Sequence, residues 1–136
     1  MTDGHAVYID TSAFLKLAMA EEHSHDLGRW ALEHDASFVS SYLLRVEAVR
    51  AVRRRDRSIR TDILTRLEIV RCLLVSQAIC DAASELDPLV LRTLDAIHVA
   101  TALKLAPEVD TVLTYDRRMA DAVAVAGLTP LSPGQA

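Results

Sequence analysis

The sequence predicts an α/β fold with a largely parallel central sheet, and three observations support this prediction. Short runs rich in apolar and β-branched residues alternate with longer stretches of helical period. The short runs contain few charged residues, as expected for strands covered on both faces. The chain has 136 residues, 51% of them hydrophobic, with four glycines and four prolines, which is typical of one folded domain. We therefore expect a single domain over residues 1–136.

Strands and helices are expected in regular alternation. The predicted strands, read from the segments AVYI, SFVS, CLLV, TVLT and LTPL, are 6–9, 37–40, 72–75, 111–114 and 128–131. The helical period predicts helices over 12–20, 22–33, 42–55, 59–69, 77–86, 91–105 and 117–126. Pro88 separates two of these helices, Pro107 ends the next, and Gly127 suits the C-terminal cap of the last.

The composition limits the classes of function. A net charge of −4 gives no overall attraction to nucleic acid, so local clusters of charge must be considered. No apolar run reaches the roughly 20 residues that span a bilayer, and the first ten residues lack the layout of a signal peptide. Cys72 and Cys80 suit two reduced packing thiols rather than a disulfide framework or a zinc site. We expect a cytoplasmic protein without a membrane anchor.

Two acidic residues follow predicted strands directly. Asp10 stands after VYI and Asp116 after VLTY, each just before a predicted helix. In a parallel sheet these positions lie at the carboxyl ends of strands, where open α/β folds bind ligands. Aspartate is also a good N-terminal helix cap, so a purely capping role is the alternative for each.

Two further acidic residues fall on inward faces of predicted helices. Helical spacing places Glu47 beside Leu44 and Ala48, and places Asp95 beside Val99. A buried carboxylate is costly unless something compensates its charge. For Glu47 the structural alternatives are an ion pair with Arg50 or protonation of the buried acid.

Together the four acids predict a cation site. Two acids at strand ends and two on inward helix faces can converge on one edge of the sheet, and close like charges require a cation. An oxygen-only pocket suits Mg²⁺ or Mn²⁺, whereas zinc favours the His or Cys ligands that this set lacks. Such ions activate water and neutralise charge in phosphodiester hydrolysis.

A cluster of arginines follows Glu47 in this otherwise acidic protein. It comprises Arg45, Arg50, Arg53, Arg54, Arg55, Arg57 and Arg60. The cluster can hold the phosphates of a nucleic acid or contact an acidic protein. The structural alternative is a solvated helix end whose positive charge complements the helix C-terminus.

Four segments together resemble the PIN-domain family, and more narrowly its VapC-type toxin ribonucleases of bacterial toxin–antitoxin pairs. They are YIDTSAFLKL, SSYLLRVEAVRAVRR, RTLDAIHVATAL and VLTYDRRMADAV, in the order of the family. The resemblance covers essentially the whole chain. It implies a three-layer α/β/α fold with a central parallel sheet of about five strands.

The resemblance also implies a function. It suggests an Mg²⁺- or Mn²⁺-dependent endoribonuclease whose metal-binding acids are Asp10, Glu47, Asp95 and Asp116, with Ser12 positioning the carboxylates or a metal-bound water. It further implies an RNA substrate, a homodimer and a cognate VapB-type antitoxin that inserts a segment into the active groove and uses the Arg-rich surface.

Three other residues near these motifs have open or minor roles. Asp121 lies on a different side of the last helix from Asp116, so we expect it to face solvent. His98 follows Asp95 by three residues and is expected to be a hydrogen-bonded packing residue, with a catalytic role as the alternative. Tyr115 suits either a contact with RNA or packing at the rim of the site.

Two other functions compete with the nuclease. In a phosphotransfer domain Asp10 would be the phosphate acceptor. That chemistry favours a second acid two residues later, where Ser12 stands in this chain. It also favours a lysine at a strand end, whereas Lys16 and Lys104 both lie on predicted helices. The other alternative is a non-catalytic PIN-like module that binds RNA or an antitoxin. The presence of all four carboxylates argues against it.

Overall fold

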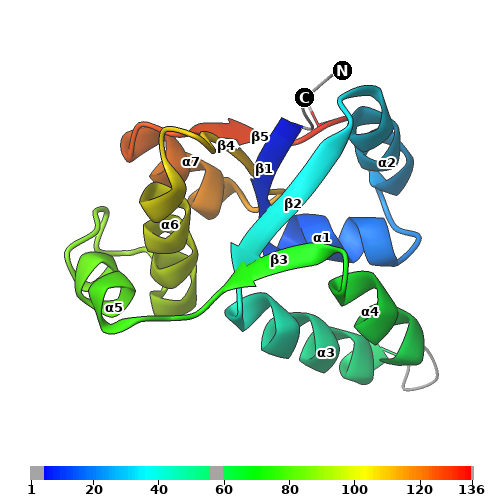
Figure 1. The fold of residues 1–136 in the computed structure, drawn as a ribbon, viewed down its shortest axis with the longest axis horizontal. Helices are drawn as coiled ribbons and strands as arrows, with labels where there is room; N and C mark the ends of the chain where they lie inside the picture. Colours follow the sequence, from blue (N-terminus) through cyan, green and yellow to red (C-terminus); the bar gives the residue numbers. More distant parts are fainter. Residues whose placement is uncertain (1–4, 56–59, 136) are drawn as a thin grey trace.

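The computed structural model describes residues 5–55 and 60–135 and has three layers, with helices on both faces of a sheet (Figure 1). The strands of this sheet are β1 (His5–Ile9), β2 (Ala36–Ser41), β3 (Val70–Leu73), β4 (Thr111–Leu113) and β5 (Thr129–Leu131). All neighbouring strands are parallel, in the order β3-β2-β1-β4-β5. The predicted three-layer class with a parallel sheet of about five strands is confirmed.

Seven helices are found in the described residues. They are α1 (Thr11–Ala18), α2 (Ser24–Glu33), α3 (Leu43–Arg55), α4 (Arg60–Leu67), α5 (Gln77–Ser84), α6 (Thr93–Leu105) and α7 (Arg117–Val125). Gly127 follows the end of α7 with φ +90°, a conformation that glycine adopts without steric cost, as its predicted capping role requires. Among these helices none combines the length and apolar character needed to cross a membrane.

The sheet is buried on both faces, because successive side chains of a strand point to opposite sides. Val7 and Ile9 of β1 pack into an apolar cluster with residues of α1 to α4, whereas Tyr8 between them packs with residues of α6 and α7. Helix α5 lies against α6. This two-sided burial explains why the strands read as nearly continuous apolar runs.

Tertiary contacts move some element boundaries away from their predicted positions. Strand β3 begins two residues earlier than predicted, because Val70 pairs with Phe38 in the ladder with β2 and is itself buried. Helix α2 begins at Ser24 rather than at residue 22, since His23 has φ 68° and interrupts helical hydrogen bonding.

Both cysteines are free thiols as expected, but only Cys72 is partly buried. Cys80 is exposed, so its predicted packing role is wrong.

The strand order places the acidic ends of β1 and β4 next to each other. The chain passes from β1 to β2 on one side and returns to place β4 on the other side of β1, so the order reverses between β1 and β4. The carboxyl ends of strands at such a switch point form the crevice where open α/β sheets bind ligands. Asp10 follows β1 and Asp116 lies three residues beyond the end of β4, at this crevice.

Candidate active site

Asp10 is both a helix cap and a buried site residue. It lies between β1 and α1, and its Oδ1 accepts hydrogen bonds from the backbone N–H of Ala13 (2.9 Å) and the hydroxyl of Ser12 (2.7 Å). Its Oδ2 accepts a hydrogen bond from the Thr114 hydroxyl. Only 5% of Asp10 is exposed, and burial raises the pKa of its carboxyl although these hydrogen bonds oppose the change.

Asp116 caps the N-terminus of α7, the helix that follows β4. One carboxylate oxygen accepts hydrogen bonds from the backbone N–H groups of Arg118 (2.9 Å) and Met119 (3.3 Å). The residue is exposed. Asp10 and Asp116 therefore both cap helices, as the alternative stated. Because these helices begin at the same edge of the sheet, a capping aspartate can also line the site there.

Glu47 points inward from α3 and is held by two partners. Its Oε1 accepts a hydrogen bond from the Thr11 hydroxyl (2.8 Å) and forms an ion pair with Nε2 of His98 (2.7 Å). Burial acts to raise the pKa of Glu47, but the hydrogen bond and charge of His98, with help from Thr11, outweigh burial, and the pKa is lowered. Glu47 is thus ionised and paired with His98; Arg50, the partner considered from sequence, is exposed.

Asp95 contributes the fourth carboxylate from the first turn of α6. It is partly buried. Burial and the negative charge of Asp116 raise the pKa of Asp95, and the charges of Asp10 and Glu47 act in the same direction. This mutual influence indicates that the four carboxylates are close enough to repel one another.

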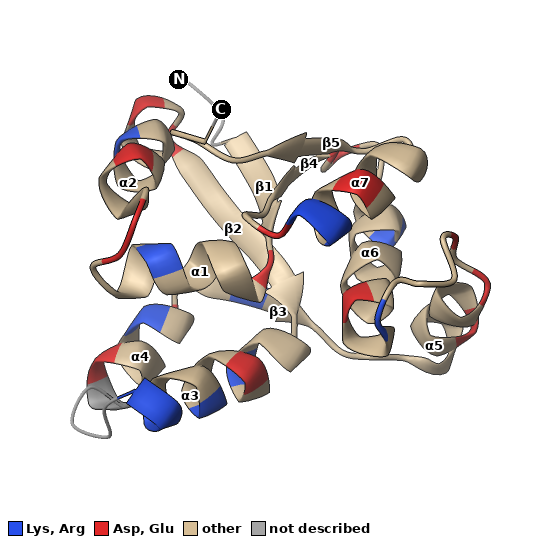
Figure 2. Cartoon of the chain, turned by 180° about the vertical axis from the view of Figure 1, so that it is seen from behind, with Lys and Arg blue, Asp and Glu red and all other residues tan. Residues whose placement is uncertain are grey.

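The four acids meet at one cavity of about 180 Å³. It is lined by Asp10, Thr11, Ser12, Glu47, Asp95, His98 and Asp116. Figure 2 shows the acidic positions on α3, on α6 and at the starts of α1 and α7 arranged around the same space. All five residues selected from sequence are therefore brought together, although they come from distant parts of the chain.

Ser12 connects Asp10 to the loop between β4 and α7. Its hydroxyl donates to Asp10 and accepts a hydrogen bond of 2.9 Å from the backbone N–H of Tyr115. Because the hydroxyl is fixed from both sides, it holds Asp10 Oδ1 in place. The role expected for Ser12, positioning the carboxylates or a metal-bound water, stays a prediction.

His98 is a site residue whose place sequence analysis did not identify. It is hydrogen-bonded and 2% exposed, as a packing histidine should be, but one of its partners is the site carboxylate of Glu47. Its Nδ1 contacts the hydroxyl of Tyr8 (2.6 Å). Burial raises the pKa of Tyr8, so the phenol stays protonated beside the imidazole. The expectation of a hydrogen-bonded packing histidine is therefore confirmed, and the residue also reaches the site.

Thr11 and Thr114 are two further residues that sequence analysis missed. Each is a hydroxyl beside a motif acid, Thr11 directly after Asp10 and Thr114 two residues before Asp116. Hydroxyl groups adjacent to strand-end acids are the signal that could have identified them. Each donates to a carboxylate from a different segment: Thr11 to Glu47, and Thr114 to Asp10.

The donor set of the cavity suits a hard cation. Four carboxylates and several hydroxyls are the oxygen ligands that Mg²⁺ and Mn²⁺ prefer, and both nitrogens of His98 are already engaged. Among the described residues no three His, Cys, Asp or Glu side chains are arranged so that they could hold an ion as they stand. Mg²⁺ commonly keeps several waters and uses only one or two carboxylates, so a closed set of protein ligands is not required.

Exposed arginines lie on two of the helices that carry or follow site acids, α3 and α7. Arg53, Arg54 and Arg55 are exposed at the end of α3, and Arg55 forms an ion pair of 2.6 Å with Glu21. Exposed Arg117 and Arg118 begin α7 directly after Asp116 (Figure 2). Of the predicted cluster, Arg57 lies outside the described residues, as does the side chain of Arg60. Asp121 is exposed and is not among the residues lining the cavity, as predicted.

Comparison with known proteins agrees with this arrangement. The family model for the PIN domain matches residues 7–125. The chain therefore belongs to the PIN domain family. It is 40% identical over 128 residues to Ribonuclease VapC46 of Mycobacterium tuberculosis, covering 94% of this chain and 98% of the relative. It is 32% identical over 135 residues to Ribonuclease VapC47 of the same species, covering 94% of this chain and 97% of that protein.

Two solved structures share the fold. The crystal structure of Mycobacterium tuberculosis VapC20, described as a sarcin-ricin loop cleaving toxin, aligns with a TM-score of 0.73 and 15% identity over 93% of this chain and 99% of that chain. VapBC2 from Rickettsia felis, bound to a DNA fragment from its promoter, aligns with a TM-score of 0.70 and 12% identity over 94% of this chain and 98% of that chain. At these identities the likeness shows the fold alone.

Proposed function

We propose that this protein is a metal-dependent endoribonuclease, the toxin of a VapBC-type toxin–antitoxin pair, which hydrolyses RNA phosphodiester bonds in the cytoplasm. The observation that carries the proposal is the meeting of Asp10, Glu47, Asp95 and Asp116 at one cavity. If Glu47 or Asp95 had pointed away from Asp10, no reason would remain to place a cation there. The curated relatives, which are named ribonucleases, support the same reaction. We treat residues 1–136 as one PIN-like domain.

The metal site would be formed by the four carboxylates. Mg²⁺ or Mn²⁺, when bound, lowers the pKa of a coordinated water and neutralises charge that develops on the phosphate and the leaving oxygen. Asp10 is the most buried of the four acids and the most extensively hydrogen-bonded, so it offers the most rigid ligand. Asp116, being exposed, lies at the open side from which RNA would enter.

The surrounding side chains prepare these carboxylates for their role. Thr11 and His98 keep Glu47 ionised and fix its orientation. Asp95 experiences the repulsion of its neighbours without a compensating hydrogen bond from the described residues, so it gains most when a cation binds. Fixed ligands and unrelieved repulsion both favour cation binding, because little reorganisation is needed.

The structure argues against the phosphotransfer alternative. Both oxygens of Asp10 accept hydrogen bonds, which makes the carboxylate a poorer nucleophile. Lys16, one of the two lysines of the chain, pairs with Glu21 at 3.5 Å and is not among the residues lining the cavity. Asp10 therefore lacks the nearby lysine that this chemistry favours.

RNA cleavage by the purified protein tests the proposal. We expect cleavage of a structured RNA with Mg²⁺ or Mn²⁺ that is abolished by EDTA. We expect Asp10→Asn to lose more than the roughly 10- to 100-fold typical of groups that only support a metal ligand. Asp121→Asn is the matched control, since Asp121 is exposed outside the cavity, and should cleave at the normal rate.

Two outcomes would contradict the proposal. Full activity of Asp10→Asn would exclude the proposed metal role. A protein that binds RNA but shows no binding of Mg²⁺ or Mn²⁺ by calorimetry and no cleavage would favour the non-catalytic module instead.

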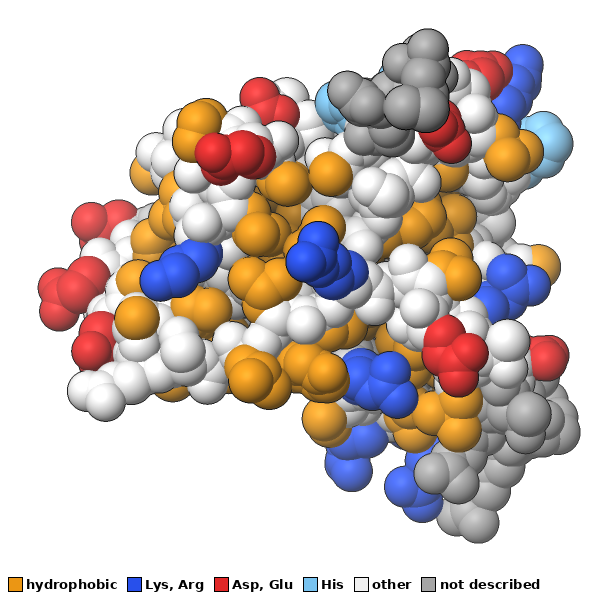
Figure 3. Space-filling model, in the orientation of Figure 1, with side chains coloured by type: hydrophobic (Ala, Val, Ile, Leu, Met, Phe, Trp, Pro, Cys, Tyr) orange, Lys and Arg blue, Asp and Glu red, His pale blue; other side chains and the backbone are white. Residues whose placement is uncertain are grey.

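The proposed partners are a VapB-type antitoxin and a second copy of the chain. We expect the antitoxin to insert a segment over the carboxylates and to contact the exposed arginines at the end of α3. Hydrophobic side chains gather over the middle of the face seen in Figure 3, next to basic side chains. Among the residues that the structure describes, the large exposed apolar ones are Leu32, Tyr42, Val46, Leu64, Ile69, Leu74, Leu89, Val90, Leu94 and Val125. This number of exposed apolar residues suits a homodimer, which light scattering at micromolar concentration would detect.

A further inference from the structure

The loop between β4 and α7 carries three groups of the site. Thr114 donates its hydroxyl hydrogen to Asp10, the backbone N–H of Tyr115 donates to Ser12 at 2.9 Å, and Asp116 supplies a carboxylate. A shift of this loop would therefore move Asp116 and release the hydrogen bonds that orient Asp10. What holds the loop in place determines the geometry of the site.

The chain that follows β5 holds this loop through two side-chain hydrogen bonds. The Tyr115 hydroxyl donates to the carbonyl oxygen of Pro133 at 2.7 Å, and the Ser132 hydroxyl donates to the carbonyl oxygen of Thr114 at 2.5 Å. Strand β5 is three residues long and lies at the edge of the sheet, so its own ladder provides few bonds. The two side-chain bonds extend the attachment past the end of the strand.

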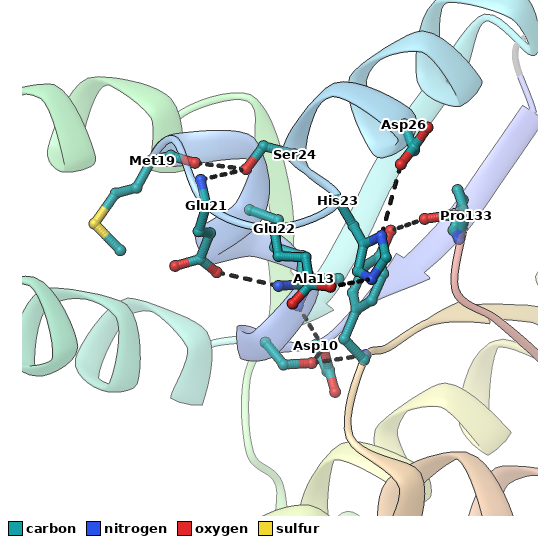
Figure 4. Close-up of polar contacts among 12 residues, drawn as sticks. Asp10, Ala13, Met19, Glu21, Glu22, His23, Ser24, Asp26 and Pro133 are labelled. Carbon is teal, nitrogen blue, oxygen red and sulfur yellow. Dashed lines mark hydrogen bonds and ion pairs between the residues drawn. The ribbon is translucent and has the colours of Figure 1, made fainter. Parts of the chain in front are cut away.

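The ring of Tyr115 is held from the other side by α1 and by the turn before α2. His23 stacks on the ring with a centroid distance of 5.7 Å and an interplanar angle of 10°, and Lys16 Nζ lies 4.9 Å from the ring centroid. His23 itself lies within 3.6 Å of an Asp26 carboxylate oxygen. Figure 4 shows His23 below Asp26 and beside Pro133, in the region above Asp10.

We propose that Tyr115, anchored to Pro133, is a positioning residue which, together with the bond from Ser132 to Thr114, holds the β4–α7 loop so that Thr114 and the Tyr115 N–H orient Asp10 and Ser12. The expected effect of Tyr115 on RNA cleavage rests on the proposed function, whereas its expected effect on the loop does not. It assigns the C-terminal segment 132–133, which contains no metal-binding side chain, a part in setting the site geometry.

Two single substitutions in the full-length chain test this inference. Tyr115→Phe keeps the ring and its stacking but removes the bond to Pro133, and Ser132→Ala removes the bond to Thr114. We expect each to lower kcat by about 10-fold while KM for RNA changes little, as for groups that support a ligand without touching substrate. We expect amide hydrogen exchange over residues 114–118 to accelerate about fivefold in each, the factor for one lost hydrogen bond.

The matched control is Tyr42→Phe. Tyr42 is 45% exposed, and within the described residues its hydroxyl has no hydrogen-bond partner, so kcat and exchange should equal those of the parent protein. Assays are run well below the melting temperature, so that a small loss of global stability does not change the folded fraction. If either Tyr115→Phe or Ser132→Ala does not fold, kcat and hydrogen exchange of the other variant test the inference.

The outcomes distinguish the inference from the proposed function. Parent-like kcat and parent-like exchange in both variants would overturn the inference while Asp10→Asn remained inactive. A fall in kcat that only follows the unfolded fraction would also overturn it. If Asp10→Asn cleaved RNA normally, the proposed function would fail, and the exchange measurement would still decide whether segment 132–133 holds the loop.

Discussion

The carboxylate of Glu47 and the imidazole of His98 are joined at 2.7 Å, although 51 residues separate them in the chain. His98 is 2% exposed and also contacts the buried hydroxyl of Tyr8. The contact links α3 and α6, which carry the two inward acids. It converts Glu47 from a costly buried charge into a fixed, ionised carboxylate.

Removal of the His98 side chain should affect both stability and activity. His98→Ala leaves the Tyr8 hydroxyl and the Glu47 carboxylate without this partner, and we expect a loss of about 1 to 3 kcal/mol in the free energy of unfolding. We expect RNA cleavage to fall by about 10- to 100-fold, because Glu47 loses its orientation. Urea unfolding and initial cleavage rates measure the two effects. His25→Ala, at an exposed position, serves as control. Unchanged cleavage in folded His98→Ala would show that the histidine only packs.

Asp95 should destabilise the metal-free protein near neutral pH. Burial and Asp116 raise its folded-state pKa, so the folded state binds more protons than the unfolded state between the two pKa values. Stability therefore falls as pH rises through that window. Asp95→Asn should raise the free energy of unfolding at neutral pH by about 0.5 to 2 kcal/mol, and the gain should disappear at acidic pH. Thermal unfolding in EDTA across pH measures this, with Asp121→Asn as the neutral control.

Glu47 should stabilise the metal-free protein at neutral pH, which is the opposite of the effect expected for Asp95. Its folded-state pKa is lowered, so its contribution is present above the unfolded pKa and is lost as pH falls through the folded pKa. Glu47→Gln should therefore destabilise the same metal-free protein at neutral pH, and the difference from the parent should shrink in acid. If Asp95→Asn and Glu47→Gln shifted stability in the same direction, the assignment of His98 as the partner that ionises Glu47 would be wrong.

Divalent cations should stabilise the folded protein. Binding to the folded state alone adds RT ln(1 + [L]/Kd), about 2.7 kcal/mol at a concentration 100 times Kd. We expect the melting temperature to rise with Mn²⁺ and to return with EDTA. Asp10→Asn should lose this response, while Asp121→Asn should retain it. An equal rise in both variants would place the cation elsewhere on the protein.

The arginines at the end of α3 should contribute to RNA affinity through phosphate contacts. In an Asp10→Asn background, Arg53→Gln should weaken RNA binding and reduce the slope of log K against log salt by about 0.7, the value for one single-stranded phosphate contact. Fluorescence anisotropy over a range of salt concentrations measures the slope. Arg29→Gln is the matched control, since Arg29 is exposed on α2 and pairs with Glu33 at 3.4 Å. Equal slopes for both variants would show that Arg53 at the end of α3 makes no contact with an RNA phosphate.

Element boundaries show where local pattern was insufficient. The apolar run CLLV predicted a strand from Cys72, but pairing of Val70 with Phe38 begins β3 earlier, because the register with β2 decides which residues join the ladder. Similarly, the positive φ of His23 delays the start of α2, and the position of its ring over Tyr115 depends on a segment more than 90 residues away. Neither feature has a local sequence signal.

The alternation of apolar runs with helical periods determined the α/β class, and the acids that interrupt those patterns identified Asp10, Glu47, Asp95 and Asp116 as candidates, because an acid on an apolar face needs a compensating partner. The tertiary structure alone decided which partners those acids have. His98 rather than Arg50 meets Glu47, Thr114 meets Asp10, and segment 132–133 meets the loop before α7. The reason is physical: strand order and helix packing set the direction and distance of side chains from distant segments, and sequence spacing specifies neighbours only within one helix or strand.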